Sequence, residues 1–546
     1  MNFSLKSIPK ITALYWGTIT LLVIVNFATT FIGFHPHHDG LVFTTIRLLK
    51  ANFLNGGEYP FNQYGSFWAM PYFGISLNVN DGLLLFSMRV LTIFIYFLTG
   101  LLTFKIAKNL YSTGVAKVSL AILILSRPIG LEPIPWPSSI GMFLTVLITF
   151  LVVKALKLQN SFKRNSLLAI AGAVVVMSTL TRIQIGGLTL LFICVYLVAT
   201  RMKDLIPFFA GMAGFSILYG SWLASLGWLS DSLWDQFVFG WIVASSEDTD
   251  RTFPRISLMI LIFLAILSAT LQRVPITGAH RRAYLSFSII ACIATVFYTA
   301  VSPHSSQTYL GRFWVATFLF AIVLFVVNFK VLLKNQERIP LLLGLLGLSN
   351  ASQIFPLFDP MHAWWGITPL VIPLSKWLVQ SLFPILNAKL RIYSFISLSV
   401  LMILPYVLGI STQRVYPMSV NDLSLIYSGS TQSKAYETNR EFFVREIPRG
   451  ARVLNFCVDS DLFFNSDLAI NASRYFVYWP TMNNVARIQK EILNSQPDFV
   501  LFCNLESTSI PQKLQEKFTN FPYKKIGSLN SEISLQLYTH SQKVPG

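Results

Sequence analysis

Long apolar runs constrain the fold of this chain more than any other feature. Leu83–Phe104 and Ile392–Ile410 are each long enough to cross about 30 Å of hydrocarbon as a helix. Only 12% of the 546 residues are charged, whereas a soluble globular protein carries roughly 25%. No alternating barrel pattern accompanies the runs, so helices must satisfy the backbone groups inside the bilayer. The sequence therefore predicts a polytopic α-helical membrane protein.

About thirteen transmembrane helices are expected. The predicted spans are 11–34, 83–104, 111–127, 136–156, 166–181, 183–200, 204–228, 255–272, 283–301, 311–329, 339–355, 364–386 and 392–411. Only Thr181–Arg182 separates the fifth span from the sixth. The first span lacks a small-residue cleavage site, so we expect it to be retained rather than removed as a signal peptide.

The basic residues indicate the orientation of these spans. If the N-terminus is cytoplasmic, the cytoplasmic turns hold nineteen Lys and Arg but only two acids, Asp204 and Glu337. This is the positive-inside asymmetry. The net charge of +18 is therefore interpreted as a topology signal rather than as a nucleic-acid surface, and no nucleic-acid partner is expected. A surface for an anionic ligand is the alternative. The odd number of spans predicts an N-in, C-out chain.

Residues 412–546 lose the membrane composition and follow a transmembrane domain of residues 1–411. The segment is predicted to alternate helices with strands, the helices at 434–447, 484–494 and 510–518, the strands at 452–458, 498–503, 523–528 and 532–539. We expect a small extracytoplasmic α/β domain. In that compartment a disulfide between Cys457 and Cys503 is an open alternative.

The segment His35–Gly40 follows the first span directly. A carboxylate at that depth is costly unless it is paired or faces water, so Asp39 is a functional candidate. It can accept a proton from an attacking hydroxyl. The alternative is that Asp39 caps a helix that begins at Gly40. His37 and His38 are adjacent and lack the spacing of a zinc site, so we predict no metal ligands here.

Two further segments are candidates for substrate binding. The glycines and proline of residues 56–68 predict a shaped loop, whose polar side chains Glu58, Gln63 and Tyr64 are candidate substrate ligands. Residues 358–369 join Asp359 and His362 to Trp365 at a helix entrance. Interface anchoring by the aromatic residues is the alternative for both segments. In the second segment Asp359 would then be a helix cap.

Four arginines are expected at the outer ends of helices. A guanidinium at the rim of a bundle holds a phosphate through several donors. Arg312 and Arg182 are the predicted ligands of a donor phosphate, with snorkelling to the interface as the alternative. Arg89 lies farther inside its span, which favours a structural pairing, and Arg127 stays undecided between the two roles.

These parts together resemble the GT-C superfamily of glycosyltransferases, which includes protein O-mannosyltransferases, oligosaccharyltransferases and aminoarabinose transferases. The resemblance covers the whole chain in architecture. In motifs it rests on His37–Gly40, on Gln63–Gly65, and on His362–Trp365 followed by Pro369.

The resemblance implies a transferase of a bacterial plasma membrane. It would move a sugar from a polyprenyl-phosphate carrier to an extracytoplasmic hydroxyl of a glycan, lipid or protein, with inversion at the anomeric carbon. Asp39 would be the catalytic base, with His38 beside it, and His37, Tyr64 or His362 would orient the sugar or the acceptor. Many members carry two neighbouring acids here, whereas this chain has Gly40 in the second place, so the second carboxylate is missing or comes from another loop, such as Glu58.

Three questions stay open from the sequence. No cofactor is assigned, but a divalent metal is possible, and the acidic stretch Glu247–Asp250 is a potential contributor to its site. A transporter or flippase of lipid-linked glycans would explain the bundle and its basic rims. A non-catalytic envelope scaffold would explain the C-terminal domain.

Overall fold

The computed structural model describes most of the N-terminal half and parts of the rest. The described residues are 8–33, 36–62, 64–127, 133–239, short pieces between 318 and 332, 338–354, 360–382, short pieces between 392 and 400, 415–417, 425–455, 469–471, 473–474, 494–504, 523–530 and 534–540.

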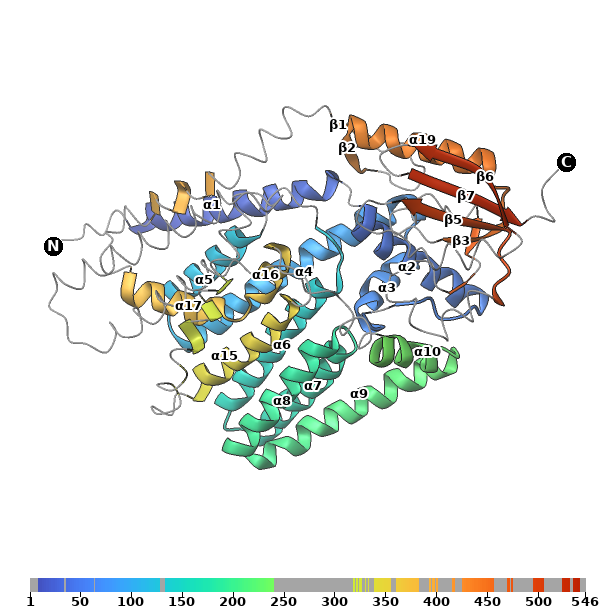
Figure 1. The fold of residues 1–546 in the computed structure, drawn as a ribbon. Helices are drawn as coiled ribbons and strands as arrows, with labels where there is room; N and C mark the ends of the chain where they lie inside the picture. The colour runs from blue at the N-terminus through green and yellow to red at the C-terminus, as the bar shows by residue number, and fades with distance from the viewer. Residues whose placement is uncertain are drawn as a thin grey trace.

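A helical bundle makes up most of the described chain (Figure 1). Its helices are α1 Ile8–Ala28, α2 Pro36–Asn55, α3 Met70–Ser76, α4 Asp81–Leu110, α5 Thr113–Ser126, α6 Pro137–Lys157, α7 Ser161–Thr179, α8 Ile183–Thr200, α9 Leu205–Ser225, α10 Leu229–Leu233, α15 Arg338–Ala351, α16 Pro360–Gly366 and α17 Val371–Trp377. The π-helical turns Trp234–Phe239 and Leu378–Leu382 follow α10 and α17. Among the described residues, five helical segments are long and apolar enough to cross a membrane. The chain is therefore an integral membrane protein.

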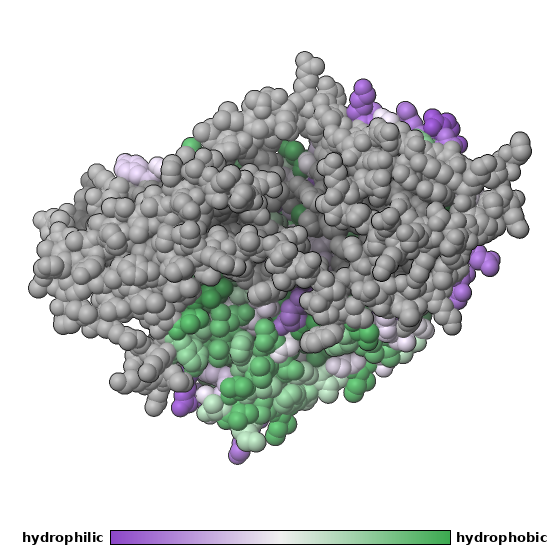
Figure 2. Space-filling view, viewed as in Figure 1, coloured by the Kyte–Doolittle hydropathy of each residue, from purple (hydrophilic) through white to green (hydrophobic). Residues whose placement is uncertain are grey.

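The outer face of α8 and α9 is apolar and exposed. Ile206, Ile217 and Leu218 on α9 are 69–74% exposed, and Figure 2 shows hydrophobic residues gathered on the face formed by these helices. In water, a contiguous patch of this kind is rare on a monomeric protein. Exposing such a patch to water is unfavourable, whereas exposing it to hydrocarbon is not. This face is therefore where the bundle meets lipid.

The structure confirms some predicted spans and corrects others. The short link at Thr181–Arg182 does separate two helices, α7 and α8. The predicted span 364–386 is wrong as one helix, because α16 ends at Gly366 and α17 begins only at Val371. Pro369 lies in this break and has no N–H with which to continue a helix. Spans 255–272 and 283–301 lie outside the described residues, so the number thirteen and the orientation stay predictions.

Helices α7 and α9 approach closely through two glycines. A Cβ at Gly211 would overlap the carbonyl oxygen of Ala169, and one at Gly172 would overlap that of Phe208. Small residues let membrane helices bring their backbones together, and packing then holds them.

Replacing Gly211 with leucine should therefore push α9 away from α7 and lower the apparent Tm of the purified protein. Overpacking of this kind costs about 1–3 kcal/mol or more. Gly214→Leu is the matched control, because nothing lies within 4 Å of a Cβ at Gly214 on the same helix. Equal Tm values for the two variants would contradict the close contact.

The C-terminal part contains a mixed sheet, with strand order β4-β3-β5-β7-β6. Its elements are β3 Ala451–Asn455, β4 Ala469–Asn471, β5 Phe499–Asn504, β6 Tyr523–Asn530 and β7 Ser534–His540, accompanied by α19 Ser430–Glu446 and the small pair β1 Val415–Pro417 and β2 Tyr427–Gly429. β3 pairs in parallel with β4 and β5, and β7 runs antiparallel to β5 and β6. The predicted helix at 434–447 and the four predicted strands are confirmed. The helix predicted at 510–518, almost all of the one at 484–494, and the side chains of Cys457 and Cys503 lie outside the described residues.

This C-terminal part contacts the bundle near α2 and α3 (Figure 1). The backbone N–H of Gly33 donates to Tyr427 at 2.8 Å, and that of Phe61 donates to Arg474 at 3.1 Å. One apolar core includes Leu41 of α2 and Val453 of β3. The two parts therefore share an interface at the end of the bundle that carries Asp39, while the domain boundary at 411/412 stays a prediction.

Candidate functional site

Asp39 forms a buried ion pair with Arg89. Asp39 lies in the first turn of α2 and Arg89 lies in α4, and neither side chain is exposed. Arg89 Nη2 lies 2.7 Å from Asp39 Oδ2, and Arg89 also donates to the carbonyls of Thr30 and Gly33 at 3.2 and 3.0 Å. The capping alternative for Asp39 is wrong, because α2 begins at Pro36 and the carboxylate turns to Arg89. The structural pairing expected of Arg89 is confirmed.

Tyr64, predicted to bind substrate, and Arg182, predicted to bind the donor phosphate, lie together. Arg182 follows α7, is 4% exposed, and places its Cζ 5.4 Å from the centre of the Tyr64 ring. That ring also meets the Trp136 ring edge-on at 5.1 Å. A guanidinium over an aromatic face is attracted by the ring quadrupole, so the tyrosine holds the cation in place.

His362 and Trp365 lie together on α16. Their rings meet edge-on at 5.1 Å, and Trp365 Nε1 lies 3.5 Å from the hydroxyl of Tyr96. Trp365 is 2% exposed, so it packs inside the bundle and the interface-belt alternative for this residue is wrong. Tyr96 in turn hydrogen-bonds Ser139 at 2.8 Å.

Arg127 lies between the first and third of these pairs. It donates to Asn26 Oδ1 and, at 3.3 Å, to Thr29 Oγ1, next to the Thr30 carbonyl that Arg89 uses. Its Cζ lies 5.6 Å from the centre of the Tyr96 ring. Arg127 thus connects the first pair to the third. Ser139, whose N–H donates to the Trp136 carbonyl at 2.9 Å, connects Tyr96 of the third to Tyr64 of the second.

An apolar slot of about 250 Å³ runs between α1, α4 and α5 toward this arginine. Its lining is almost wholly hydrocarbon and aromatic, and consists of Trp16, Ile19, Val23, Asn26, Ile93, Tyr96, Phe97, Gly100, Leu101, Phe104, Leu120, Leu123, Ile124, Arg127 and Trp364. Trp16 and Phe97 are 39% and 48% exposed, so the slot has walls that reach the outer surface of the bundle. From Trp16 to Asn26 it follows roughly 15 Å of α1, about half the thickness of a bilayer core.

The other predicted site residues are placed as follows. His37 and His38 lie in the first turn of α2. Glu58 is exposed just past the far end of α2, roughly 24 Å of helix from Asp39, so it does not supply a neighbouring carboxylate. Gln63, Arg312, Asp359 and the stretch 247–250 lie outside the described residues. Within the described residues, no group of three His, Cys, Asp or Glu side chains is placed to hold a metal ion.

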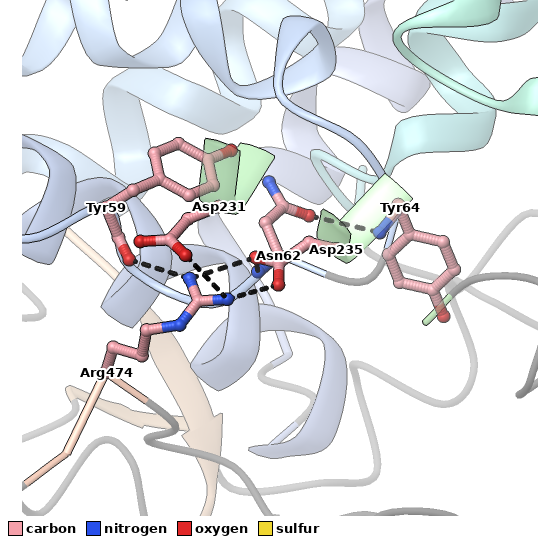
Figure 3. Close-up of polar contacts among 6 residues, drawn as sticks. All are labelled: Tyr59, Asn62, Tyr64, Asp231, Asp235 and Arg474. Atoms are coloured by element: carbon pink, nitrogen blue, oxygen red, sulfur yellow. Dashed lines mark hydrogen bonds and ion pairs between the residues drawn. The ribbon is translucent and has the colours of Figure 1, made fainter. Parts of the chain in front are cut away.

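Sequence reasoning missed a second buried ion pair, between Asp235 and Arg474 (Figure 3). Arg474 Nη2 lies 2.5 Å from Asp235 Oδ1 and 4.0 Å from Asp231, and Nη1 donates to the Tyr59 carbonyl at 3.0 Å. Asp235 Oδ2 accepts from the backbone N–H of Asn62 at 3.0 Å. The signal available in the sequence was the spacing of Asp231 and Asp235, four residues apart in the run 229–239, which holds no other charged residue.

The pKa of Asp235 is shifted by this environment. Burial raises the pKa of Asp235 to about 7, against the opposing effects of the Arg474 guanidinium and the Asn62 N–H. Because the folded value exceeds the ordinary value of 3.8, the contribution of this group to stability is fully present at low pH and is lost as the pH rises through about 7.

The Tm of the wild type should therefore fall relative to that of Asp235→Asn between pH 5 and pH 8. Asparagine does not titrate, so the variant provides the reference at each pH. Two pKa units in this interval correspond to about 3 kcal/mol. A wild type that instead gains stability over the variant as the pH rises would show that the pKa of Asp235 is depressed.

Comparison with known proteins found similarity to solved structures and none to a family model or a curated sequence. An oligosaccharyltransferase from Archaeoglobus fulgidus, solved with Zn and sulfate, is 10% identical, with 89% of this chain and 67% of that chain covered and a TM-score of 0.49. The archaeal oligosaccharyltransferase AglB from the same organism, in complex with an inhibitory peptide and a dolichol-phosphate, is 11% identical over 97% and 75% of the chains, with a TM-score of 0.48.

A bacterial structure is also similar. ArnT from Cupriavidus metallidurans, bound to undecaprenyl phosphate, is 12% identical over 97% of this chain and 98% of that chain, with a TM-score of 0.38. At these identities and TM-scores, no residue role is carried over to this chain. AglB and ArnT are both membrane glycosyltransferases of the GT-C superfamily.

Proposed function

We propose that this protein is a membrane glycosyltransferase that moves a sugar from a polyprenyl-phosphate carrier to an acceptor hydroxyl, with Asp39 as the base. The observation that carries the proposal is the completely buried carboxylate of Asp39, held by Arg89 at the end of the bundle that meets the C-terminal part. Burying a charge costs free energy, so an ionised side chain at membrane depth is a functional candidate by default.

The chemistry requires little besides positioning. The acceptor O–H gives its proton to Asp39 as its oxygen forms a bond to the anomeric carbon of the sugar. The bond from that carbon to the phosphate oxygen breaks, and the electron pair leaves with polyprenyl phosphate. A phosphate is a good leaving group, so the protein must orient the acceptor, remove its proton and hold the phosphate. Direct displacement inverts the anomeric centre, and burial keeps competing water away.

Arg182 is the proposed ligand of the donor phosphate. Its buried guanidinium lies against Tyr64, and both residues were predicted from the sequence to bind substrate, Arg182 through the donor phosphate. Arg127 is also buried, but its two terminal nitrogens already donate to Asn26 and Thr29, so it serves polar groups of the bundle itself. A guanidinium fork suits a phosphate because it presents several donors at once.

The apolar slot is the proposed site of the first isoprenoid units of the carrier. Its walls are apolar, and Tyr96 in its lining is connected to the predicted site residues through Arg127, Ser139 and Trp365. No metal has an assigned role in this proposal.

Leu123→Trp should fill the slot and weaken binding of polyprenyl phosphate to the purified protein at least tenfold, which is about 1.4 kcal/mol. Leu191→Trp is the matched control, because Leu191 is 53% exposed on the lipid-facing side of α8. Unchanged binding in Leu123→Trp, with an unchanged Tm, would place the carrier elsewhere.

A further inference from the structure

We propose that Arg474 is a positioning residue for the Tyr64–Arg182 pair, so that the C-terminal part builds the donor site as well as neighbouring it. The contacts run from Arg474 through Asp235 and Asn62. The inference rests on the proposed function only for the role of Arg182 as a phosphate ligand. The geometry itself can be tested without any reaction.

An ion pair between Arg474 and Asp235 crosses the interface between the C-terminal part and the bundle. Two nitrogens of Arg474 face the two carboxylate oxygens of Asp235, at 2.5 and 3.3 Å, and Asp235 is completely buried. Arg474 also donates to the Tyr59 carbonyl and accepts, through its own carbonyl, from the N–H of Phe61. One residue of the C-terminal part thus fixes three points of the bundle.

The turn around Asn62 links this ion pair to Tyr64. Its N–H donates to Asp235 Oδ2, which leaves its side-chain oxygen to accept from the Tyr64 N–H at 3.2 Å and from Trp68 Nε1 at 3.0 Å. Figure 3 shows Asn62 lying between Asp235 and Tyr64. Because Asn62 and Trp68 are both buried, water does not replace these bonds without cost. The position of the Tyr64 backbone therefore depends on where Asp235 holds Asn62.

The same loop, residues 59–68, also contacts the link between α7 and α8, which carries Arg182. Phe67 N–H donates to the Leu180 carbonyl at 3.1 Å, and Gly65 has a φ of +105° where a Cβ would overlap that carbonyl. Gln236, the neighbour of Asp235, donates to the Thr179 carbonyl. The ion pair thus acts on both partners, on Tyr64 through Asn62 and on the α7–α8 link through Gln236.

The chemistry of the pair fits a positioning role better than a purely stabilising one. Removing two charges from water offsets much of the attraction between them, so a buried ion pair contributes little net stability. A bidentate guanidinium–carboxylate pair fixes distance and angle together, which a lysine does not. We infer that the pair sets the orientation of the loop 59–68 against the link between α7 and α8.

Hydroxyl-radical footprinting of Tyr64 tests the geometry directly. In Arg474→Gln, labelling of the Tyr64 ring should rise several-fold, with a smaller rise in Arg474→Lys and no change at Tyr15 on α1. Arg449→Gln is the control, because Arg449 is exposed in the same part of the chain and should leave Tyr64 unchanged. Unchanged Tyr64 labelling in a folded Arg474→Gln protein would overturn the inference.

A second variant keeps the test valid if Arg474→Gln does not fold. Asn62→Ala leaves the ion pair intact but removes the acceptor for Tyr64 and Trp68, so it should also raise labelling of Tyr64. Adding Arg474→Gln to it should raise the labelling by less than the sum of the two single increases, since residues in one network are not additive. Unchanged Tyr64 labelling in Asn62→Ala, or fully additive increases in the double variant, would overturn the proposed route.

Binding of polyprenyl phosphate separates this inference from the proposed function. Arg182→Gln and Arg474→Gln should each weaken binding about tenfold, and Arg449→Gln should not. If Arg182→Gln binds normally, the phosphate role of Arg182 is wrong while the footprint still decides the positioning role. If Arg182→Gln weakens binding and Arg474→Gln does not, the positioning role is wrong.

Discussion

Arg89→Met is expected to lower the free energy of unfolding by about 3–5 kcal/mol, the cost of leaving one partner of a buried ion pair without the other. The guanidinium of Arg89 holds Asp39 Oδ2 and the carbonyls of Thr30 and Gly33. Methionine fills similar space but supplies no donor. Thermal unfolding of the purified variant in detergent or nanodiscs measures the effect.

Two comparison variants show whether burial is the cause. Combining Arg89→Met with Asp39→Asn removes both charges and should recover much of the lost stability. Arg47→Met breaks an ion pair with Asp81, whose side chain is 32% exposed, so it should cost no more than about 1 kcal/mol. A single Arg89→Met variant as stable as Arg47→Met would contradict the account of the Asp39–Arg89 pair.

Asp39→Asn should reduce sugar transfer by a factor of about 10²–10⁴, the range that a positioned general base contributes. The amide oxygen of asparagine still accepts a hydrogen bond from Arg89, so the local geometry is kept while the proton acceptor is lost. Binding of the donor should change little, because the donor phosphate is assigned to Arg182. The expected pattern is therefore a lower kcat at a nearly unchanged KM for the donor.

Asp81→Asn is the control for this prediction. Asp81 begins α4 and forms ion pairs with Arg47 and Lys50 at the partly exposed start of that helix. It should retain most of the transfer activity. Full turnover by Asp39→Asn would show that another group takes the acceptor proton.

Much of the bundle is predictable from the sequence because its signals are local. Apolar runs and their basic flanks define α4, α6 and α8, and the two residues Thr181–Arg182 sufficed to divide α7 from α8. The break between α16 and α17 was missed, because residues 364–386 are apolar throughout and hydropathy does not register a backbone interruption. The strands β5 and β7 were predicted from short apolar or alternating runs between turn residues.

Some residues of the candidate site were predictable from the sequence and others were not. Depth in the membrane singled out Asp39, and position inside a helix indicated that Arg89 pairs structurally. The pairing of Asp235 with Arg474 joins residues 239 positions apart. No periodicity or spacing reports a contact at that separation, and only the folded arrangement of the loop 59–68 shows why both charges are buried.

Release of polyprenyl phosphate is the measurement that tests the central proposal most directly. Purified wild type and Asp39→Asn would be reconstituted in lipid with a panel of labelled polyprenyl-phosphate sugars and crude envelope acceptors, with and without divalent metal. Release by the wild type from at least one donor is expected, together with its loss in an Asp39→Asn protein that remains folded and still binds the donor. No release from any donor, or equal release by both proteins, would contradict the proposal.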